Sequence, residues 1–235
     1  MSTVGELFAV IDLSGVLTNA ILGGIVAREE RMDPIGFLTL ALLSGLGGGI
    51  IRDTLLQHGP PVALTDFRYA LCAVVGAVIA FLIPVGGRAW HAVFPWVDAL
   101  ALGCWATAGA QKTLALGLGW TPALLLGTIT AVGGGTLRDI TAHRVPKIFG
   151  GTTLYATSAL AAAAVVTGFW YAGLGQAGVL IGTAVGAALC LYSRHRGWQL
   201  WSGLSWEYSF SREPGQRLPR ISVRMVRDRP TDGQR

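Results

Sequence analysis

The sequence contains few charged residues. Asp, Glu, Lys and Arg together make up only 13% of its 235 residues, about half of the roughly 25% that is usual in soluble globular domains. Apolar residues make up 52% of the chain. This composition excludes an ordinary water-soluble domain and indicates a protein of the lipid bilayer.

Cysteine and catalytic motifs are also scarce. Cys72, Cys104 and Cys190 all lie inside apolar runs, where cysteine behaves as a small hydrophobic residue. The four histidines lack the spacing of metal ligands, and the sequence has no nucleophile elbow or phosphate-binding loop. We therefore expect no enzyme activity, no disulfide framework, no metal or other cofactor, and no nucleic-acid partner.

Seven apolar runs approach the length of about 20 residues that a helix needs to cross the hydrocarbon core of a membrane. The first run has no positively charged region ahead of it, so we expect a retained helix rather than a cleaved signal peptide. The sequence predicts an all-α integral membrane protein with seven transmembrane helices. The runs cover residues 5–27, 35–56, 67–85, 91–117, 121–141, 152–173 and 176–192.

An offset of 86 residues aligns the first half of the chain with the second half without a gap. It superposes GGGIIRD at residues 47–53 on GGGTLRD at residues 133–139, and it also matches Tyr69 with Tyr155. Each repeat holds three spans, so the second repeat must enter the membrane from the opposite side. We expect residues 1–86 and 87–173 to be inverted three-helix repeats, a design typical of proteins that move solutes, and residues 174–195 to be a seventh helix outside the symmetry.

A glycine triplet lies deep within the second predicted span and another within the fifth. Glycine weakens a helix by about 1 kcal/mol relative to alanine, so each triplet permits a kink or break at membrane depth, which is tolerated only against protein or a watery cavity. The alternative is close helix packing alone. The candidate kink residues of a pore are Gly47, Gly48, Gly49, Gly133, Gly134 and Gly135.

Six of the charged residues within these spans recur at equivalent positions of the two repeats, and a charge within a span seldom faces lipid. We interpret them as the mouths or gates of a pathway, the alternative being ordinary charges at helix ends. We predict that the aspartate of the first helix of each repeat neutralises the arginine of the second helix, although pairing within each adjacent Arg-Asp is equally possible. The candidates are Arg52, Asp53, Arg138, Asp139, Asp12 and Asp98.

Basic residues predict the orientation, because they favour cytoplasmic loops. One set of loops holds Arg28, Arg31, Arg88 and Arg144, whereas the other holds mainly Arg68 and Lys112. We therefore expect the N-terminus outside and the C-terminus in the cytoplasm of a bacterial inner membrane. Residues 196–235 are polar and rich in arginine, which predicts a disordered cytoplasmic tail, with contact to anionic lipid as the alternative.

The duplicated GGG-x-x-R-D motif, each copy preceded by an Asp-bearing helix, resembles the prokaryotic members of the trimeric intracellular cation channel (TRIC) family. The resemblance implies a homotrimer with a pore in each protomer between the two repeats, conducting monovalent cations, chiefly K⁺. It also implies kinks at the glycines and pore-facing positions at both Arg-Asp pairs. Trp105, which aligns with Asn19 of the first repeat, does not fit the family pattern.

The same repeat unit is also labelled a glycine transporter domain, so a secondary transporter of glycine or another small amino acid is a rival function. A channel needs a continuous, weakly binding path, whereas a transporter needs a closed site with alternating access. A third alternative is a scaffold or lipid-binding membrane protein without flux. A bare sequence shows neither the continuity of a pore nor the closure of a site.

Overall fold

In the computed structural model, the described residues are 3–85, 87–146, 148–149, 154–198, 205–211 and 220–226. They form eight helices in a unit that covers residues 1–199, and two strands in a unit that covers residues 200–235. The helices are α1 (Thr3–Glu29), α2 (Pro34–Leu56), α3 (Val62–Thr65), α4 (Phe67–Leu82), α5 (Arg88–Ala115), α6 (Trp120–Thr141), α7 (Tyr155–Tyr171) and α8 (Gly175–Arg196).

Each predicted apolar run coincides with one helix, and only the single-turn helix α3 was not expected. Among the described residues, four helical stretches are long and apolar enough to cross a membrane, and α4 is apolar but shorter. The chain is therefore an all-helical membrane protein in this unit. The four stretches are Ala9–Glu29, Pro34–Leu56, Trp90–Ala115 and Gly175–Arg196.

Local sequence sets the ends of the helices that position the site. α2 begins behind Asp33, whose carboxylate accepts a hydrogen bond from the backbone N–H of Gly36 at 2.8 Å, with proline at the first helical position. Such a cap satisfies a backbone donor that has no partner in the first turn. α2 ends at Leu56, and the backbone of the next residue, Gln57, adopts the left-handed conformation. Asp66 caps α4 in the same way through the backbone N–H of Arg68 at 3.0 Å.

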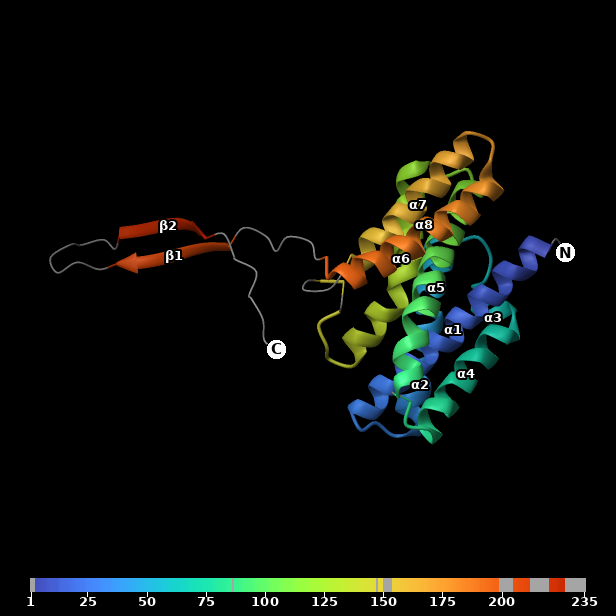
Figure 1. Ribbon diagram of the computed structural model, residues 1–235, viewed down its shortest axis with the longest axis horizontal. Coiled ribbons are helices and arrows are strands. Elements are labelled where there is room, and N and C mark those ends of the chain that lie inside the picture. The colour runs from blue at the N-terminus through green and yellow to red at the C-terminus, as the bar shows by residue number, and fades with distance from the viewer. Residues whose placement is uncertain are drawn as a thin grey trace. The chain divides into compact units, whose positions relative to one another are not determined.

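The helices pack in two groups of three that meet in the middle of the unit (Figure 1). α1 packs against α2 and α4, and α5 packs against α6 and α7, while α8 lies on α5 and α7. The contacts of α2 with α6 and of α1 with α5 join the two groups. Many core positions are alanine, such as Ala20, Ala99 and Ala106, which allows the close helix packing that membrane bundles need.

The second unit corrects the expectation of a disordered tail for the two stretches that the structure describes there. β1 (Ser205–Ser211) and β2 (Arg220–Val226) pair in antiparallel register, with Tyr208 opposite Val223. Both stretches alternate polar residues with aromatic, β-branched or other apolar residues. This period of two and this residue usage favour strands, a local signal that the overall polarity of the tail conceals.

Candidate functional site

The glycine triplets lie where α2 crosses α6. A Cβ atom added to Gly48 would overlap the carbonyl oxygen of Thr130, and one added to Gly134 would overlap the carbonyl oxygen of Ser44. These four residues form two pairs separated by 86 positions, so the two repeats make equivalent contacts. Gly47 and Gly133, the first glycines of the triplets, also face the backbone of the other helix, each with a Cβ position 3.2 Å from a glycine Cα.

Both helices continue through their triplets, α2 as far as Leu56 and α6 as far as Thr141. The break that the sequence analysis allowed is therefore not present in the described residues of either helix. The glycines instead let two backbones approach each other without intervening side chains. A kink at the glycines as part of a pore stays a prediction.

The third glycine of each triplet faces open space instead of the other helix. The nearest atom to a Cβ at Gly49 would be Nη2 of Arg52 at 3.9 Å, and for Gly135 it would be Nη2 of Arg138 at 3.7 Å. Gly49 and Gly135 each line a cavity beside the crossing. These glycines therefore leave room for the arginine of their own repeat.

The first of these cavities, cavity A, has a volume of about 80 Å³ and is lined by Asp12, Ser44, Arg52, Asp53, Tyr69 and Trp105 among others. Its buried carboxylate, Asp53, accepts hydrogen bonds from Arg52 Nε at 2.7 Å and Lys112 Nζ at 2.7 Å. The backbone N–H of Val62, the first residue of α3, is a third donor at 3.0 Å. Two positively charged side chains and the backbone N–H at the start of α3 thus donate hydrogen bonds to one carboxylate.

The second cavity, cavity B, has a volume of about 180 Å³ and is lined by Asn19, Asp98, Arg138, Asp139, Tyr155 and Arg194 among others. Arg138 and Asp139 form an ion pair at 2.7 Å, with side chains only 4% and 5% exposed. Nη1 of Arg138 also donates to the hydroxyl of Ser44 at 3.4 Å. Because Ser44 lines cavity A, this hydrogen bond connects the linings of the two cavities.

The aspartates of α1 and α5 have partners other than those we predicted. Asp12 accepts hydrogen bonds from the hydroxyl of Tyr69 and, at 2.6 Å, from Nε1 of Trp105. Asp98 accepts hydrogen bonds from the hydroxyl of Tyr155 at 2.9 Å and from Nη2 of Arg194 at 3.3 Å.

The predicted pairs Asp12–Arg52 and Asp98–Arg138 are therefore wrong, and the alternative of pairing within each adjacent Arg-Asp is confirmed. An arginine side chain is long enough to fold back onto the next residue, and a tyrosine hydroxyl satisfies each remaining aspartate.

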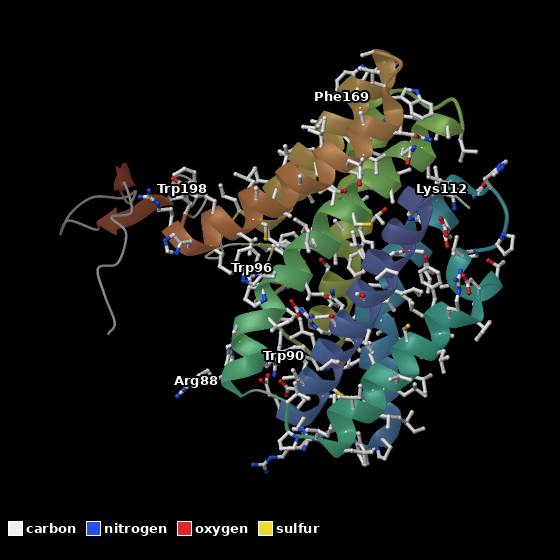
Figure 2. The ribbon with its side chains drawn as sticks, turned by 45° about the vertical axis from the view of Figure 1, so that its right-hand side comes forward. Arg88, Trp90, Trp96, Lys112, Phe169 and Trp198 are labelled. Carbon is white, nitrogen blue, oxygen red and sulfur yellow. The ribbon has the colours of Figure 1, made fainter. Side chains whose placement is uncertain are left out.

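The sequence analysis missed several residues that complete the site. Tyr69 and Tyr155 could have been found, because the offset of 86 residues aligns them as it aligns Asp12 and Asp98. Lys112 and Arg194 carry no such signal, since the offset places Val26 against the lysine and α8 lies outside the repeats. Figure 2 shows Lys112 at the end of α5 remote from Arg88 and Trp90.

Comparison with known proteins gives one matching family model, which is described as Glycine transporter and matches residues 9–84 and 95–171. The two matched stretches begin 86 residues apart (95 minus 9), the offset of the internal repeat. A UPF0126 membrane protein of Deinococcus radiodurans is 35% identical over 165 residues, which cover 70% of this chain and 77% of that protein. The UPF0126 inner membrane protein YadS of Escherichia coli K12 is 34% identical over 151 residues, 64% of this chain and 72% of YadS.

Solved structures with a similar fold are TRIC cation channels. A chain from work on the structural basis for conductance through TRIC cation channels is 29% identical, with a TM-score of 0.77 over 82% of this chain and 95% of that chain. The TRIC orthologue from Rhodobacter sphaeroides is 28% identical, with a TM-score of 0.73 over 82% of this chain and 99% of that chain. The chain therefore belongs to the family of UPF0126 membrane proteins that the Glycine transporter model describes, and its helical unit is similar in fold to prokaryotic TRIC channels.

Proposed function

We propose that the protein is a channel for monovalent cations, chiefly K⁺, with a pore in each protomer between two inverted three-helix repeats. The observation that carries this proposal is the pair of cavities beside the glycine crossing, each lined by an Arg-Asp pair and a further aspartate. Cavity A and cavity B are separate, and the hydrogen bond from Arg138, which lines cavity B, to Ser44, which lines cavity A, connects their linings. A small shift of α2 and α6 would join the cavities into one path.

The charges of the two cavities suit a cation better than their arginines first suggest. Arg52 and Arg138 are each paired with the neighbouring aspartate at 2.7 Å, so neither presents an uncompensated positive charge. Carboxylate and hydroxyl oxygens line both cavities, and oxygen atoms of this kind can replace the hydration shell of a cation. The similarity in fold to TRIC cation channels supports the same function.

We base the proposed oligomeric state and the proposed membrane on the same similar proteins. A homotrimer agrees with the description of the Rhodobacter sphaeroides protein as a trimeric channel, and a bacterial inner membrane agrees with the name of the Escherichia coli relative. We propose the N-terminus outside and the C-terminus inside because of the distribution of basic residues. The lipid bilayer and the permeating cation are then the expected partners.

A secondary transporter of glycine is the second candidate. The description of the matching family model favours it, and so does the separation of the two cavities, because alternating access requires a path that is closed on one side at a time. Cavity B pairs arginines with aspartates, a combination that could hold both charged ends of an amino acid.

Flux measurements on purified protein in liposomes separate the two candidates. We expect rapid K⁺ flux that does not depend on glycine. Saturable uptake of labelled glycine without K⁺ leak would refute the channel and support the transporter, whereas absence of both fluxes would refute both candidates.

A plugged variant makes the test specific for this path. Gly49→Leu adds a side chain to the lining of cavity A, at a position where an added Cβ would have Nη2 of Arg52 as its nearest atom at 3.9 Å, so we expect it to lower K⁺ flux strongly. Gly87→Leu is the matched control, because a Cβ at Gly87 would meet no atom within 4 Å and this residue lies at the start of α5, away from both cavities. Equal flux in the two variants would place the path elsewhere.

A further inference from the structure

At one of the positions that line the cavities, the two repeats carry side chains of very different size. The offset of 86 residues places Trp105 of α5 against Asn19 of α1. Nε1 of Trp105 donates a hydrogen bond to Asp12 Oδ1 at 2.6 Å. The amide of Asn19 instead donates to the backbone carbonyl of Gly15 in its own helix at 3.2 Å, and Asn19 lines cavity B beside Asp98.

The bond of Trp105 crosses the interface between the repeats. Asp12 belongs to α1 of the first repeat, whereas Trp105 belongs to α5 of the second. A hydrogen bond to a carboxylate is about twice as strong as one between neutral groups. On cavity B, the carboxylate of Asp98 is held by Tyr155 and Arg194, and among the described residues no donor from the first repeat bonds it.

The indole also takes up space in cavity A. Its ring packs on Gly15, where an added Cβ would lie 3.1 Å from Cζ2 of Trp105. Cavity A, which Trp105 lines, has a volume of about 80 Å³, and cavity B, which has asparagine at the equivalent position, has about 180 Å³. The bulky Trp105 thus lines the smaller cavity of the proposed path, and the smaller Asn19 lines the larger cavity.

The hydrogen bonds of Asp12 fix the position of the indole. Oδ1 accepts from Trp105 and Oδ2 accepts from the hydroxyl of Tyr69. A carboxylate oxygen can accept more than one hydrogen bond, so Trp105 restricts the path through its bulk and its fixed position and not by using up the carboxylate.

We infer that Trp105 is the gate residue of cavity A, which closes the path there by latching onto Asp12 across the repeat interface and which widens the cavity when it moves aside. This inference rests on the proposed cation channel. It assigns unequal roles to the two halves, with cavity A as the regulated half and cavity B as the open one.

Two substitutions at Trp105 separate the hydrogen bond from the bulk of the ring. Trp105→Asn makes the position equal to that of the first repeat, and Trp105→Phe keeps a ring but removes the donor. Loss of one hydrogen bond to a charged group can change an equilibrium by about tenfold. We therefore expect K⁺ flux to rise roughly tenfold in Trp105→Asn and severalfold in Trp105→Phe. Trp96→Phe on the same helix, with its side chain largely exposed, is the matched control and should conduct like the unchanged protein.

A second measurement does not depend on flux. In a protein with Cys72→Ser, Cys104→Ala and Cys190→Ala, the substitution Ser44→Cys places a thiol at the inner end of cavity A. We expect a membrane-impermeant thiol reagent to modify this cysteine faster when Trp105→Asn or Trp105→Phe is added, and at the unchanged rate when Trp96→Phe is added.

The outcomes separate the gate from the proposed function. Unchanged labelling rates with both Trp105 variants would overturn the gate, as would unchanged flux in a protein that conducts K⁺. A protein that conducts no K⁺ but shows faster labelling would overturn the channel and leave Trp105 as the latch of cavity A. If Trp105→Asn does not fold, Trp105→Phe decides the question, because it keeps an aromatic ring at this position.

Discussion

At the scale of single residues, the three glycines of each triplet have different surroundings although their sequence is identical. The middle glycines, Gly48 and Gly134, touch backbone carbonyl oxygens of the opposite helix, while Gly49 and Gly135 face the cavities. Backbone atoms cannot move aside as a flexible side chain can. The middle positions therefore maintain the contact between the repeats, and the third positions determine the space beside the arginines.

Substitution by alanine distinguishes these positions. We expect Gly48→Ala to lower the stability of the protein by about 1–3 kcal/mol, because the new methyl group would overlap the carbonyl oxygen of Thr130 and force the helices apart. Gly49→Ala is the matched control, since its methyl group would meet its nearest neighbour at an ordinary 3.9 Å. Thermal unfolding in detergent measures both variants. Equal unfolding temperatures would show that the crossing does not depend on Gly48.

The sequence pattern identified the candidate site residues but not all of their hydrogen-bond partners. The offset of 86 residues identified the glycines and both Arg-Asp pairs without any structure, because a duplicated motif is visible in the letters alone. One of the two partners of Asp12 is Trp105, which comes from the other repeat. No spacing rule reports which side chain crosses an interface between helices, so this contact required coordinates.

At the scale of elements, ion pairs connect helices in two different environments. Lys112 of α5 reaches the buried Asp53 of α2 at 2.7 Å. Arg144, after α6, reaches Glu29 and Glu30 at the end of α1 at 2.7 Å and 2.6 Å, but with side chains that are between 34% and 55% exposed. Hydrogen bonds to the two glutamates hold the pKa of Arg144 above its usual value, so this arginine stays charged. We therefore expect the burial of each ion pair, and not its N–O distance, to determine how much it contributes to the stability of the bundle.

We expect Asp53→Asn to destabilise the bundle by about 3 kcal/mol, because it leaves Arg52 and Lys112 without a charged partner at a buried position. Arg144→Gln should cost less than about 1 kcal/mol, as is usual for exposed pairs. Thermal unfolding of both variants in the same detergent compares them directly. Adding Lys112→Gln to Asp53→Asn should recover part of the loss, and similar costs for the two single variants would contradict this ranking.

Hydropathy predicted the long helices well because lipid requires long apolar segments. The expected run 121–141 differs from α6 (Trp120–Thr141) by one residue, and the run 35–56 differs from α2 (Pro34–Leu56) by one as well. The single turn of α3 and the strands β1 and β2 were missed. α3 has only four residues, too few for a periodic pattern, and the strands lie in a segment whose average composition is polar.

At the scale of the whole molecule, the proposed inverted arrangement depends on how many helices cross the membrane in each repeat. α3 extends only about 6 Å at 1.5 Å per residue, so it cannot cross. α4 and α7, the third long helices of their repeats, have 16 and 17 residues, or about 24–26 Å of helix, slightly less than a hydrocarbon core of about 30 Å. Their similar lengths suggest that both repeats use the same number of crossings, and an odd number makes the repeats inverted.

Labelling at equivalent positions tests this arrangement directly. His58 follows α2, and Arg144, 86 positions later, follows α6. In the cysteine-free protein we expect a membrane-impermeant thiol reagent to modify His58→Cys on intact cells and to spare Val145→Cys, the exposed neighbour of Arg144. Opening the cells should make Val145→Cys reactive. The reverse pattern would keep the inverted repeats but turn the protein over, whereas modification of both cysteines from the same side would mean that α4 or another helix does not cross, and the pore between inverted repeats would then have no structural basis.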